Sequence, residues 1–470
     1  MLLPVTILGF FLRLIGAGQS FWLDEGASIE IASTPLSNLL AKMTTDFHPP
    51  LFYLLLKSWL PLAGKSEWLI RMPFIILASL TIPALFFFLK EALGNRKQTI
   101  ATLAALFLAI SPFHIYYSQE LRMYALNALL TTLSWLALLR FQNKGGKKNF
   151  LLYIFFSTLN LYTFYGAFFN LAAQGAFLVY KKKKAVSLFL ALLISVLLFL
   201  PWVRILLRQL ETGDVLQSLP GWSYLSGSLT LKSLLLIPLK LYFGRITFLP
   251  KTIYFFLAGL ASIFFIALGA LGAIREKLSR PLVYWALFPL AFATLLSLKT
   301  PILGYWRYLF LLPALLSLSA IGIARFPPLV RKMFIITGLT LSTISIFVYH
   351  LVLSNQREDW RGLARFISKP QSLVVMNFPT VFAPLKFYAP DQDYFLTQDS
   401  LGHVRPDLIG AFQTASIGKI RVYHIDYLSD ITDPSRSVLS SLSDDYWKVK
   451  ETNFNNLGTV TEYGILVREP

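Results

Sequence analysis

Residues 70–90 read IRMPFIILASLTIPALFFFLK, and no charged side chain lies between Arg71 and Lys90. A helix of about 20 apolar residues spans the hydrocarbon core of a bilayer, so this stretch predicts a transmembrane helix. The whole 470-residue chain is 55% hydrophobic and 14% charged, whereas soluble domains carry about 25% charged residues. This composition excludes a water-soluble enzyme and a disordered chain, and it predicts an α-helical polytopic membrane protein. The chain has no cysteine, which excludes disulfides, thiolate zinc sites and thiol nucleophiles.

Similar apolar runs recur through the first 354 residues. They predict eleven transmembrane helices, at residues 1–18, 70–90, 98–116, 123–141, 150–164, 165–180, 185–204, 252–273, 281–298, 303–324 and 333–353. Under this count the short basic loops all fall on one side, at residues 96–97, 144–148, 181–184, 275–280 and 331–332. Because cytoplasmic loops carry the excess of Lys and Arg, we expect a cytoplasmic N-terminus and an extracytoplasmic C-terminus.

The composition changes after residue 354. Residues 1–354 carry 31 basic and 10 acidic residues, while residues 355–470 carry 12 basic and 14 acidic ones. The positive excess therefore belongs to the membrane part, where it suits anionic head groups and lipid phosphates rather than nucleic acid. We expect two domains: a transmembrane domain at 1–354, with a long first outer loop at 19–69, and a small extracytoplasmic α/β domain at 355–470.

The expected α/β domain rests on a capping signal and on β-rich runs. Asp359 can cap a helix that begins at Trp360, and the runs at 372–378, 419–425 and 459–468 are rich in β-forming residues.

Two outer segments are expected to form shorter helices. After Thr34-Pro35, leucines and a methionine at helical spacing predict a helix on the membrane surface. Segment 231–245 contains three basic residues and a central proline, which favours an interfacial or re-entrant helix over a full span.

Acidic side chains are rare in the first 354 residues, and eight of the ten lie on the predicted outer side. Ionisable groups near hydrocarbon are costly and usually have a partner or a task. Asp24 and Glu25 directly follow the first predicted span, where they could bind a cation, accept a proton from a nucleophile or end the helix in water. Asp46 and His48 lie at the start of another apolar helix, where a structural role for the histidine is the ordinary expectation.

The segment 116–124 contains Glu120, Arg122 and three tyrosines, which makes it resemble a polar site more than a plain turn. Carboxylates and amides can bind the hydroxyls of a sugar, and aromatic rings can cover its apolar face.

Several arginines are candidates for an anionic ligand. The planar guanidinium of Arg307, at the outer end of the tenth span, suits phosphate oxygens. Arg13 lies within the first span and is expected to meet an acid or an anionic head group. Glu67 and Arg71 are spaced for an ion pair on one helix face.

Five motifs occur in an order that resembles a known family. The chain contains Trp-Leu-Asp-Glu at 22–25, His-Pro-Pro-Leu-Phe-Tyr-Leu-Leu-Leu-Lys at 48–57, Ser-Glu-Trp-Leu-Ile-Arg-Met-Pro at 66–73, Tyr-Ser-Gln-Glu-Leu-Arg-Met-Tyr at 117–124 and Trp-Arg-Tyr-Leu at 306–309. It resembles the prokaryotic C-type (GT-C) membrane glycosyltransferases of the protein O-mannosyltransferase-like and aminoarabinose-transferase-like groups. The resemblance covers residues 5–130 and 300–325, and the segment 358–362 is similar to the start of the outer domain in prokaryotic members.

The resemblance implies an inverting glycosyltransferase that moves a sugar from a polyprenyl-phosphate donor to a lipid, glycan or protein acceptor on the outer face of the cell membrane. It assigns catalysis to Asp24 and Glu25, with Asp24 as the general base on the acceptor hydroxyl. The developing phosphate charge needs cations, for which the candidates are Arg307, Arg122, Arg71 and Arg13. The polar residues that would contact sugar or acceptor are Asp46, His48, Glu67, Glu120, Tyr124 and Tyr308.

Two questions stay open at this point. Asp24, Glu25 and Asp46 could supply oxygen ligands to Mg or Mn, and the sequence does not decide whether a divalent cation is needed. The alternative to a transferase is a transporter or flippase of lipid-linked sugars without transfer chemistry. Transporters usually place charge near the midplane and show internal repeats. The clustering of acids on one outer face and the lack of a visible repeat favour the enzyme.

Overall fold

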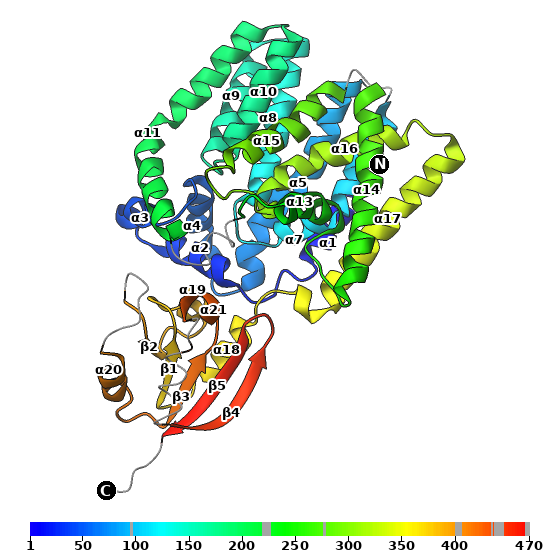
Figure 1. The fold of residues 1–470 in the computed structure, drawn as a ribbon. Coiled ribbons are helices and arrows are strands. Elements are labelled where there is room, and N and C mark those ends of the chain that lie inside the picture. Colours follow the sequence, from blue (N-terminus) through cyan, green and yellow to red (C-terminus); the bar gives the residue numbers. More distant parts are fainter. Residues whose placement is uncertain are drawn as a thin grey trace, which may run out of the picture. The chain divides into compact units, whose positions relative to one another are not determined.

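The structure is a computed structural model that describes residues 1–94, 97–218, 227–275, 279–399, 407–433, 436 and 446–465. The chain forms two compact units (Figure 1). The first unit comprises Met1–Gly18 and Ile31–Asn355, and the second comprises Gln19–Glu30 and Gln356–Pro470. The segment Gln19–Glu30, which is the beginning of the first outer loop, therefore packs with the C-terminal residues.

The first unit is helical. Its elements are α1 (Leu2–Leu14), α3 (Leu36–Met43), α4 (Leu51–Ala63), α5 (Glu67–Leu93), α6 (Gln98–Ala109), α7 (Pro112–Ser118), α8 (Tyr124–Lys144), α9 (Lys147–Leu161), α10 (Ala167–Lys181), α11 (Ala185–Ser218), α13 (Leu231–Phe243), α14 (Lys251–Arg275), α15 (Arg280–Leu296), the 3-10 helix η3 (Tyr305–Leu311), α16 (Leu312–Ile323), α17 (Pro328–Leu351) and the 3-10 turn η4 (Leu353–Asn355). Helix α2 (Leu23–Ser33) begins in the second unit and ends in the first.

Each of the eleven predicted spans overlaps at least one helix. Within the described residues, six helical segments are long and apolar enough to cross a membrane: α5, α8, α11, α14, η3 with α16, and α17. The pair α6 and α7 makes a seventh if it is counted as one span bent by 57°. The α-helical multi-pass architecture is thus confirmed, whereas the number eleven and the orientation of the termini stay predictions.

The shorter expected helices also form. Helix α3 follows Pro35 and buries Leu39 and Met43, while Leu36 and Leu40 remain exposed. Helix α13 covers most of the segment 231–245 and ends just before Gly244, whose φ of 84° suits glycine. Their predicted places at the membrane surface stay predictions.

The bend between α6 and α7 is held by Arg13. Pro112 has no N–H group, so it cannot continue the hydrogen bonds of α6, and Ser111 instead caps α7 by accepting from His114 N. The carbonyls of Leu108 and Ala109 at the end of α6 accept from the Arg13 guanidinium at 3.1 and 2.9 Å. Arg13 thus donates hydrogen bonds to carbonyls that, because of the bend, have no i+4 N–H partner in the helix.

Helices α14 and α16 pack backbone against backbone. A Cβ atom at Gly322 would lie 1.9 Å from the Leu268 carbonyl oxygen, and one at Gly272 would lie 2.2 Å from the Leu318 carbonyl oxygen. Glycine at these positions lets two apolar helices approach closely, as small residues do in membrane helix pairs.

The second unit is an α/β domain with a five-stranded sheet in the order β2-β1-β3-β5-β4. Its strands are β1 (Ser372–Met376), β2 (Asp393–Leu396), β3 (Arg421–Ile425), β4 (Tyr446–Phe454) and β5 (Gly458–Ile465). Strand β1 pairs in parallel with β2 and β3, whereas β5 is antiparallel to β3 and β4. The predicted small α/β fold is confirmed, and the end of the predicted run 459–468 lies outside the described residues.

Helices cover both faces of this sheet. They are α18 (Trp360–Ile367), α19 (Ala383–Tyr388), α20 (Leu408–Ala415) and α21 (Ser429–Thr432). One core contains α18 and α19 with the side chains of Val374 and Tyr423, and the other contains Phe412 of α20 with Val375 and Val422. The expected cap is present, because the Asp359 carboxylate accepts from Gly362 N at 2.9 Å.

Candidate functional site

The loop between α3 and α4 places Asp46 beside His48. The Tyr53 hydroxyl donates to Asp46 Oδ2 at 2.6 Å, and His48 Nδ1 lies 3.3 Å from the same oxygen. The side chains of His48 and Asp46 are 12% and 13% exposed. The loop is held from α11, where the Gln209 amide donates to the carbonyls of Met43 and His48 at 2.7 and 3.2 Å.

The environment sets the charges of this pair. Burial opposes ionisation of Asp46, but His48, Arg122 and the Tyr53 hydroxyl outweigh it and lower the pKa of that carboxyl. Burial lowers the pKa of His48 despite the attraction of Asp46, and the charges of Arg122 and Arg307 act in the same direction. Asp46 is therefore an anion and His48 a neutral imidazole near neutral pH.

Two arginines from other segments face this pair. Arg122, in the break between α7 and α8, brings its Nη2 to 3.4 Å from His48 Nδ1. Arg307 of η3 donates to the Pro301 carbonyl at 3.2 Å and lies over the Trp306 ring, and its charge interacts with that of Arg122. We call Asp46, His48, Arg122 and Arg307 the arginine cluster.

Aromatic side chains border the arginine cluster. The Phe164 ring stacks on His48 with centroids 6.5 Å apart and contacts Tyr124 edge-on at 5.9 Å. Tyr124 and Tyr308 interact electrostatically with Arg307, and the Tyr308 hydroxyl donates to the Ile302 carbonyl at 3.1 Å. The structure thus brings together six predicted site residues: Asp46, His48, Arg122, Tyr124, Arg307 and Tyr308.

Glu120 belongs to a neighbouring group around Arg245. The Arg245 guanidinium donates to the Tyr116 hydroxyl at 2.5 Å and lies over the Tyr116 ring. The charge of Arg245 also interacts with Glu120, Tyr117 and Tyr305. Arg245 was not among the predicted site residues, although it stands at the end of the segment 231–245 that had been singled out for its basic residues.

The other predicted residues of the first unit lie elsewhere. Glu67 is in the first turn of α5, and Arg71 in the same helix donates to the Ala17 carbonyl at 2.7 Å. Arg13 was expected to meet an acid or a head group, but its partners are three carbonyls, Ser118 and His114. All five of its N–H groups donate to the protein, so we leave Arg13 out of the proposed phosphate site.

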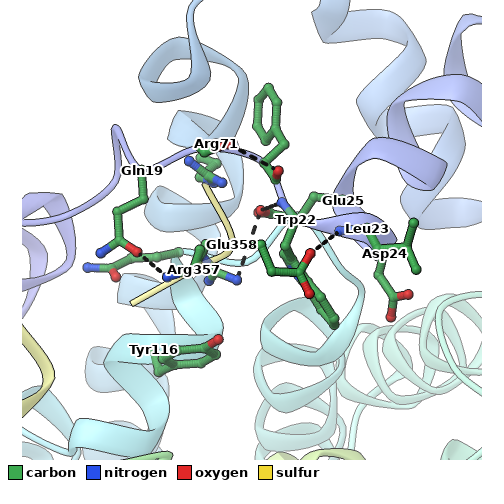
Figure 2. A network of polar contacts seen from close by, with 12 residues as sticks. Gln19, Trp22, Leu23, Asp24, Glu25, Arg71, Tyr116, Arg357 and Glu358 are labelled. Atoms are coloured by element: carbon green, nitrogen blue, oxygen red, sulfur yellow. Dashed lines mark hydrogen bonds and ion pairs between the residues drawn. The ribbon is translucent and has the colours of Figure 1, made fainter. Parts of the chain in front are cut away.

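Asp24 and Glu25 lie in the second unit, at the start of α2. Four hydrogen bonds join residues 19–23 to the C-terminal part. Gln19 Oε1 accepts from Arg357 N at 2.9 Å, and Ser20 Oγ accepts from Arg361 N at 3.0 Å. Phe21 N donates to Tyr388 Oη at 2.9 Å, and Leu23 N donates to Glu358 Oε2 at 3.1 Å. Figure 2 shows two of these contacts, Gln19 with Arg357 and Leu23 with Glu358.

The two adjacent acids differ in their surroundings. Glu25 is fully buried; its Oε2 accepts from Trp22 N at 3.3 Å and lies 3.9 Å from Arg357 Nη1. A glutamate at the third helical position that bonds back to the residue before the helix is half of a capping box. The Asp24 side chain is partly exposed and points away from Arg357 (Figure 2).

Among the described residues, no three His, Asp or Glu side chains gather in a way that could hold a metal ion. Asp46 lies in the first unit and the Asp24-Glu25 pair in the second. A role of these carboxylates as ligands of Mg or Mn stays a prediction.

Sequence reasoning missed Tyr53, Arg245, Arg357 and Glu358 as members of these groups. Tyr53 and Glu358 stood inside motifs that carried the family resemblance, at 48–57 and 358–362, and that was the available signal. Nothing in the local pattern marked Arg357.

Comparisons with known proteins agree with this architecture. Residues 47–205 match the family sequence model described as dolichyl-phosphate-mannose-protein mannosyltransferase. No curated protein matches the chain.

Among solved structures, the chain is similar to ArnT from Cupriavidus metallidurans in the apo state, with a TM-score of 0.63 at 14% identity over 98% of this chain and 97% of that one. The same protein bound to undecaprenyl phosphate gives 0.60 at 14% identity over 100% and 98%. The Archaeoglobus fulgidus oligosaccharyltransferase, in complex with Zn and sulfate, gives 0.55 at 12% identity over 99% and 73%.

At identities of 12–14% the structural matches show a common fold only, and the match to the family sequence model applies to residues 47–205. The comparisons thus bear out the expected class, the C-type (GT-C) membrane glycosyltransferases, in fold over nearly the whole chain and in sequence over that segment.

Proposed function

We propose that the protein transfers a sugar from a polyprenyl-phosphate donor to an acceptor hydroxyl on the outer face of the membrane. Arg122 and Arg307 bind the donor phosphate, and Asp24 is the general base. The observation that carries the proposal is the arginine cluster, in which residues from three separate parts of the first unit meet.

The charge of the arginine cluster fits a phosphodiester. Two guanidiniums, one carboxylate and a neutral imidazole leave a net charge of one positive, which matches the single negative charge of a sugar-phosphate-lipid diester. When the sugar leaves, the lipid phosphate gains a second negative charge, so the same cations interact more strongly with the leaving group than with the donor. Stabilisation that grows towards the transition state is what accelerates a reaction.

The reaction has one proton transfer and one displacement. The Asp24 carboxylate accepts the acceptor's hydroxyl proton, the acceptor oxygen bonds to the anomeric carbon, and the bond from that carbon to the phosphate oxygen breaks. The electron pair of the broken bond stays on the polyprenyl phosphate, and attack opposite the leaving group inverts the anomeric centre. Asp24 suits the role of base because its side chain is partly exposed, whereas Glu25 is fully buried.

The relatives support the donor class. One ArnT structure is bound to undecaprenyl phosphate, and an Archaeoglobus fulgidus oligosaccharyltransferase structure contains a dolichol-phosphate and an inhibitory peptide. We extend the polyprenyl-phosphate part of these ligands to this chain and leave the acceptor as lipid, glycan or protein.

The test is a turnover assay on the full-length protein in nanodiscs with radiolabelled polyprenyl-phosphate sugars and an envelope extract. Wild type should release polyprenyl phosphate and move the label into a new product, and a parallel sample with EDTA tests the divalent cation. Asp24→Asn should abolish transfer without loss of donor binding. Arg307→Ala should raise the donor KM more than Arg307→Lys, while Arg204→Ala, on the exposed face of α11, should behave as wild type.

Absence of donor binding for every polyprenyl-phosphate sugar would reject the proposal. Retained transfer in Asp24→Asn would remove Asp24 as the base, and equal effects of the two Arg307 variants would argue against bidentate phosphate contact.

A further inference from the structure

The carboxylate of Glu358 accepts hydrogen bonds from three donors: Trp360, two residues along the chain, and Leu23 and Tyr427, which are far away in the sequence. Its Oε2 accepts from Leu23 N at 3.1 Å and from Trp360 Nε1 at 2.7 Å, and its Oε1 accepts from the Tyr427 hydroxyl at 2.9 Å. Trp360 is completely buried and Tyr427 nearly so, in the core that contains α18 and α19. Glu358 is therefore attached to the rigid part of the α/β domain, and Leu23 N is attached to Glu358 (Figure 2).

Leu23 is the first residue of α2, so this hydrogen bond caps the helix. The first N–H groups of a helix have no partner in their own ladder and usually bond to a side chain just before the helix. Here the acceptor stands 335 residues away in the sequence. The negative charge of Glu358 also interacts favourably with the N-terminal end of the α2 dipole.

The capped turn carries Asp24. Because Asp24 follows Leu23 directly, fixing the Leu23 N–H group fixes the turn from which the Asp24 carboxylate projects. Close packing supports the same turn: a Cβ atom at Gly26 would lie 2.5 Å from Pro384 N, and Phe21 packs on Phe387 with ring centroids 5.2 Å apart.

We infer that Glu358 is a positioning residue for the general base: it anchors the first turn of α2 to the α/β domain and so fixes the Asp24 carboxylate for proton transfer. This inference rests on the proposed function. It gives the C-terminal domain a task in the reaction that does not require it to touch a substrate. A misplacement of about 1 Å in a reacting group can reduce a rate by about a hundredfold, so the anchoring of this turn bears directly on kcat.

Replacing Glu358 by glutamine separates the effect of its charge from the effect of its hydrogen bonds. Burial raises the pKa of Glu358, the charge of Asp24 adds to this, and the bonds from Trp360, Tyr427 and Leu23 oppose it. Burial thus destabilises the negative charge of Glu358, whereas its oxygen atoms stabilise the turn by accepting hydrogen bonds. Glutamine keeps an oxygen for Leu23 N and Trp360 Nε1, and the Tyr427 hydroxyl can rotate to accept from the amide.

The experiment compares Glu358→Ala, Glu358→Gln and Gly26→Ala with wild type in the full-length protein in nanodiscs. Hydrogen exchange of residues 19–30 reports the anchoring of the turn without any need for activity, and transfer kinetics report its consequence. Arg421→Ala is the matched control, because it breaks an ion pair with Glu462 on the same sheet without touching residues 19–30.

We expect Glu358→Ala to raise exchange in residues 19–30 by about tenfold, the size of a lost cap. The strands β1 and β3 should exchange as in wild type, kcat should fall by about tenfold or more, and the donor KM should stay within about twofold. Gly26→Ala should also raise exchange in residues 19–30 and lower kcat, without a change of charge. Glu358→Gln should keep both exchange and kcat close to the wild-type values.

Three results would overturn the inference: unchanged exchange in Glu358→Ala, raised exchange with unchanged kcat, or a loss in Glu358→Gln as large as in Glu358→Ala. Failure of the proposed function has a different signature. In that case wild type transfers no sugar, and the positioning role falls with it, although the exchange data still report whether Glu358 anchors α2.

Discussion

His424 should make the stability of the α/β domain depend on pH. It lies in the central strand β3, is 1% exposed, and brings its Nε2 to 3.4 Å from Asn377 Oδ1. Burial lowers its pKa from 6.5 to about 4, against the charges of Asp426 and Asp433 and together with that of Arg436. The fold therefore favours the neutral imidazole. Its contribution to stability is complete above pH 6.5, declines as the pH falls through this window, and is lost below about pH 4.

The size of the effect follows from the shift. One pKa unit corresponds to 1.36 kcal/mol, so the difference between 6.5 and about 4 amounts to about 3 kcal/mol of unfolding free energy. Between pH 7 and pH 4.5 the protection of β1 and β3 against hydrogen exchange, corrected for the intrinsic rate, should fall by about a hundredfold.

The assay is exchange measured by mass spectrometry on the full-length protein in nanodiscs at several pH values. His424→Asn has no titrating group and should remove most of this pH dependence, even though carboxylates titrate near the lower end of the range. The reasoning would be refuted if the variant kept the full pH dependence, or if wild type showed the same protection at pH 4.5 as at pH 7.

Three further perturbations address the first unit. Tyr53→Phe removes the hydroxyl that donates to Asp46 and should lower kcat/KM by about tenfold, the worth of a hydrogen bond to a charged group; unchanged kinetics would argue against a role for Asp46. Gly322→Ala should destabilise the protein by about 2 kcal/mol in thermal unfolding, whereas Gly259→Ala, with open space at its Cβ, should not. Arg13→Lys should lower thermal stability but leave the donor KM unchanged; a raised KM at unchanged stability would restore its phosphate role.

Much of the first unit could be predicted from sequence, because a helix that crosses a membrane needs an unbroken run of apolar residues. The run at 70–90 became α5, and the runs at 185–204 and 333–353 became the greater part of α11 and of α17. Capping signals were equally local: Asp359 caps α18, as the pattern at 359–362 predicted. These features depend on a few neighbouring residues and on the lipid or water around them.

The polar groups could be predicted only in part. The motifs contained Asp46, His48, Arg122 and Arg307, but not the tertiary contacts that join them. Strands β2 and β4 lay outside the predicted runs; β2 has four residues and only one buried side chain, so it shows little periodicity. The capping of Leu23 by Glu358 leaves no trace in local spacing, since it joins residues 335 positions apart.

The hydrogen bond between Leu23 and Glu358 also restricts the membrane topology of the chain. Residues 19–30 and 356–465 form parts of one α/β domain, so they must lie on the same side of the membrane. The number of crossings between them is therefore even, whichever side that is. The six long helices found in the described part of the chain satisfy this parity. If α6 and α7 count as a seventh crossing, at least one of the shorter helices must cross as well. The ten spans predicted between residues 70 and 353 obey the same rule, so any revised count has to add or remove helices in pairs.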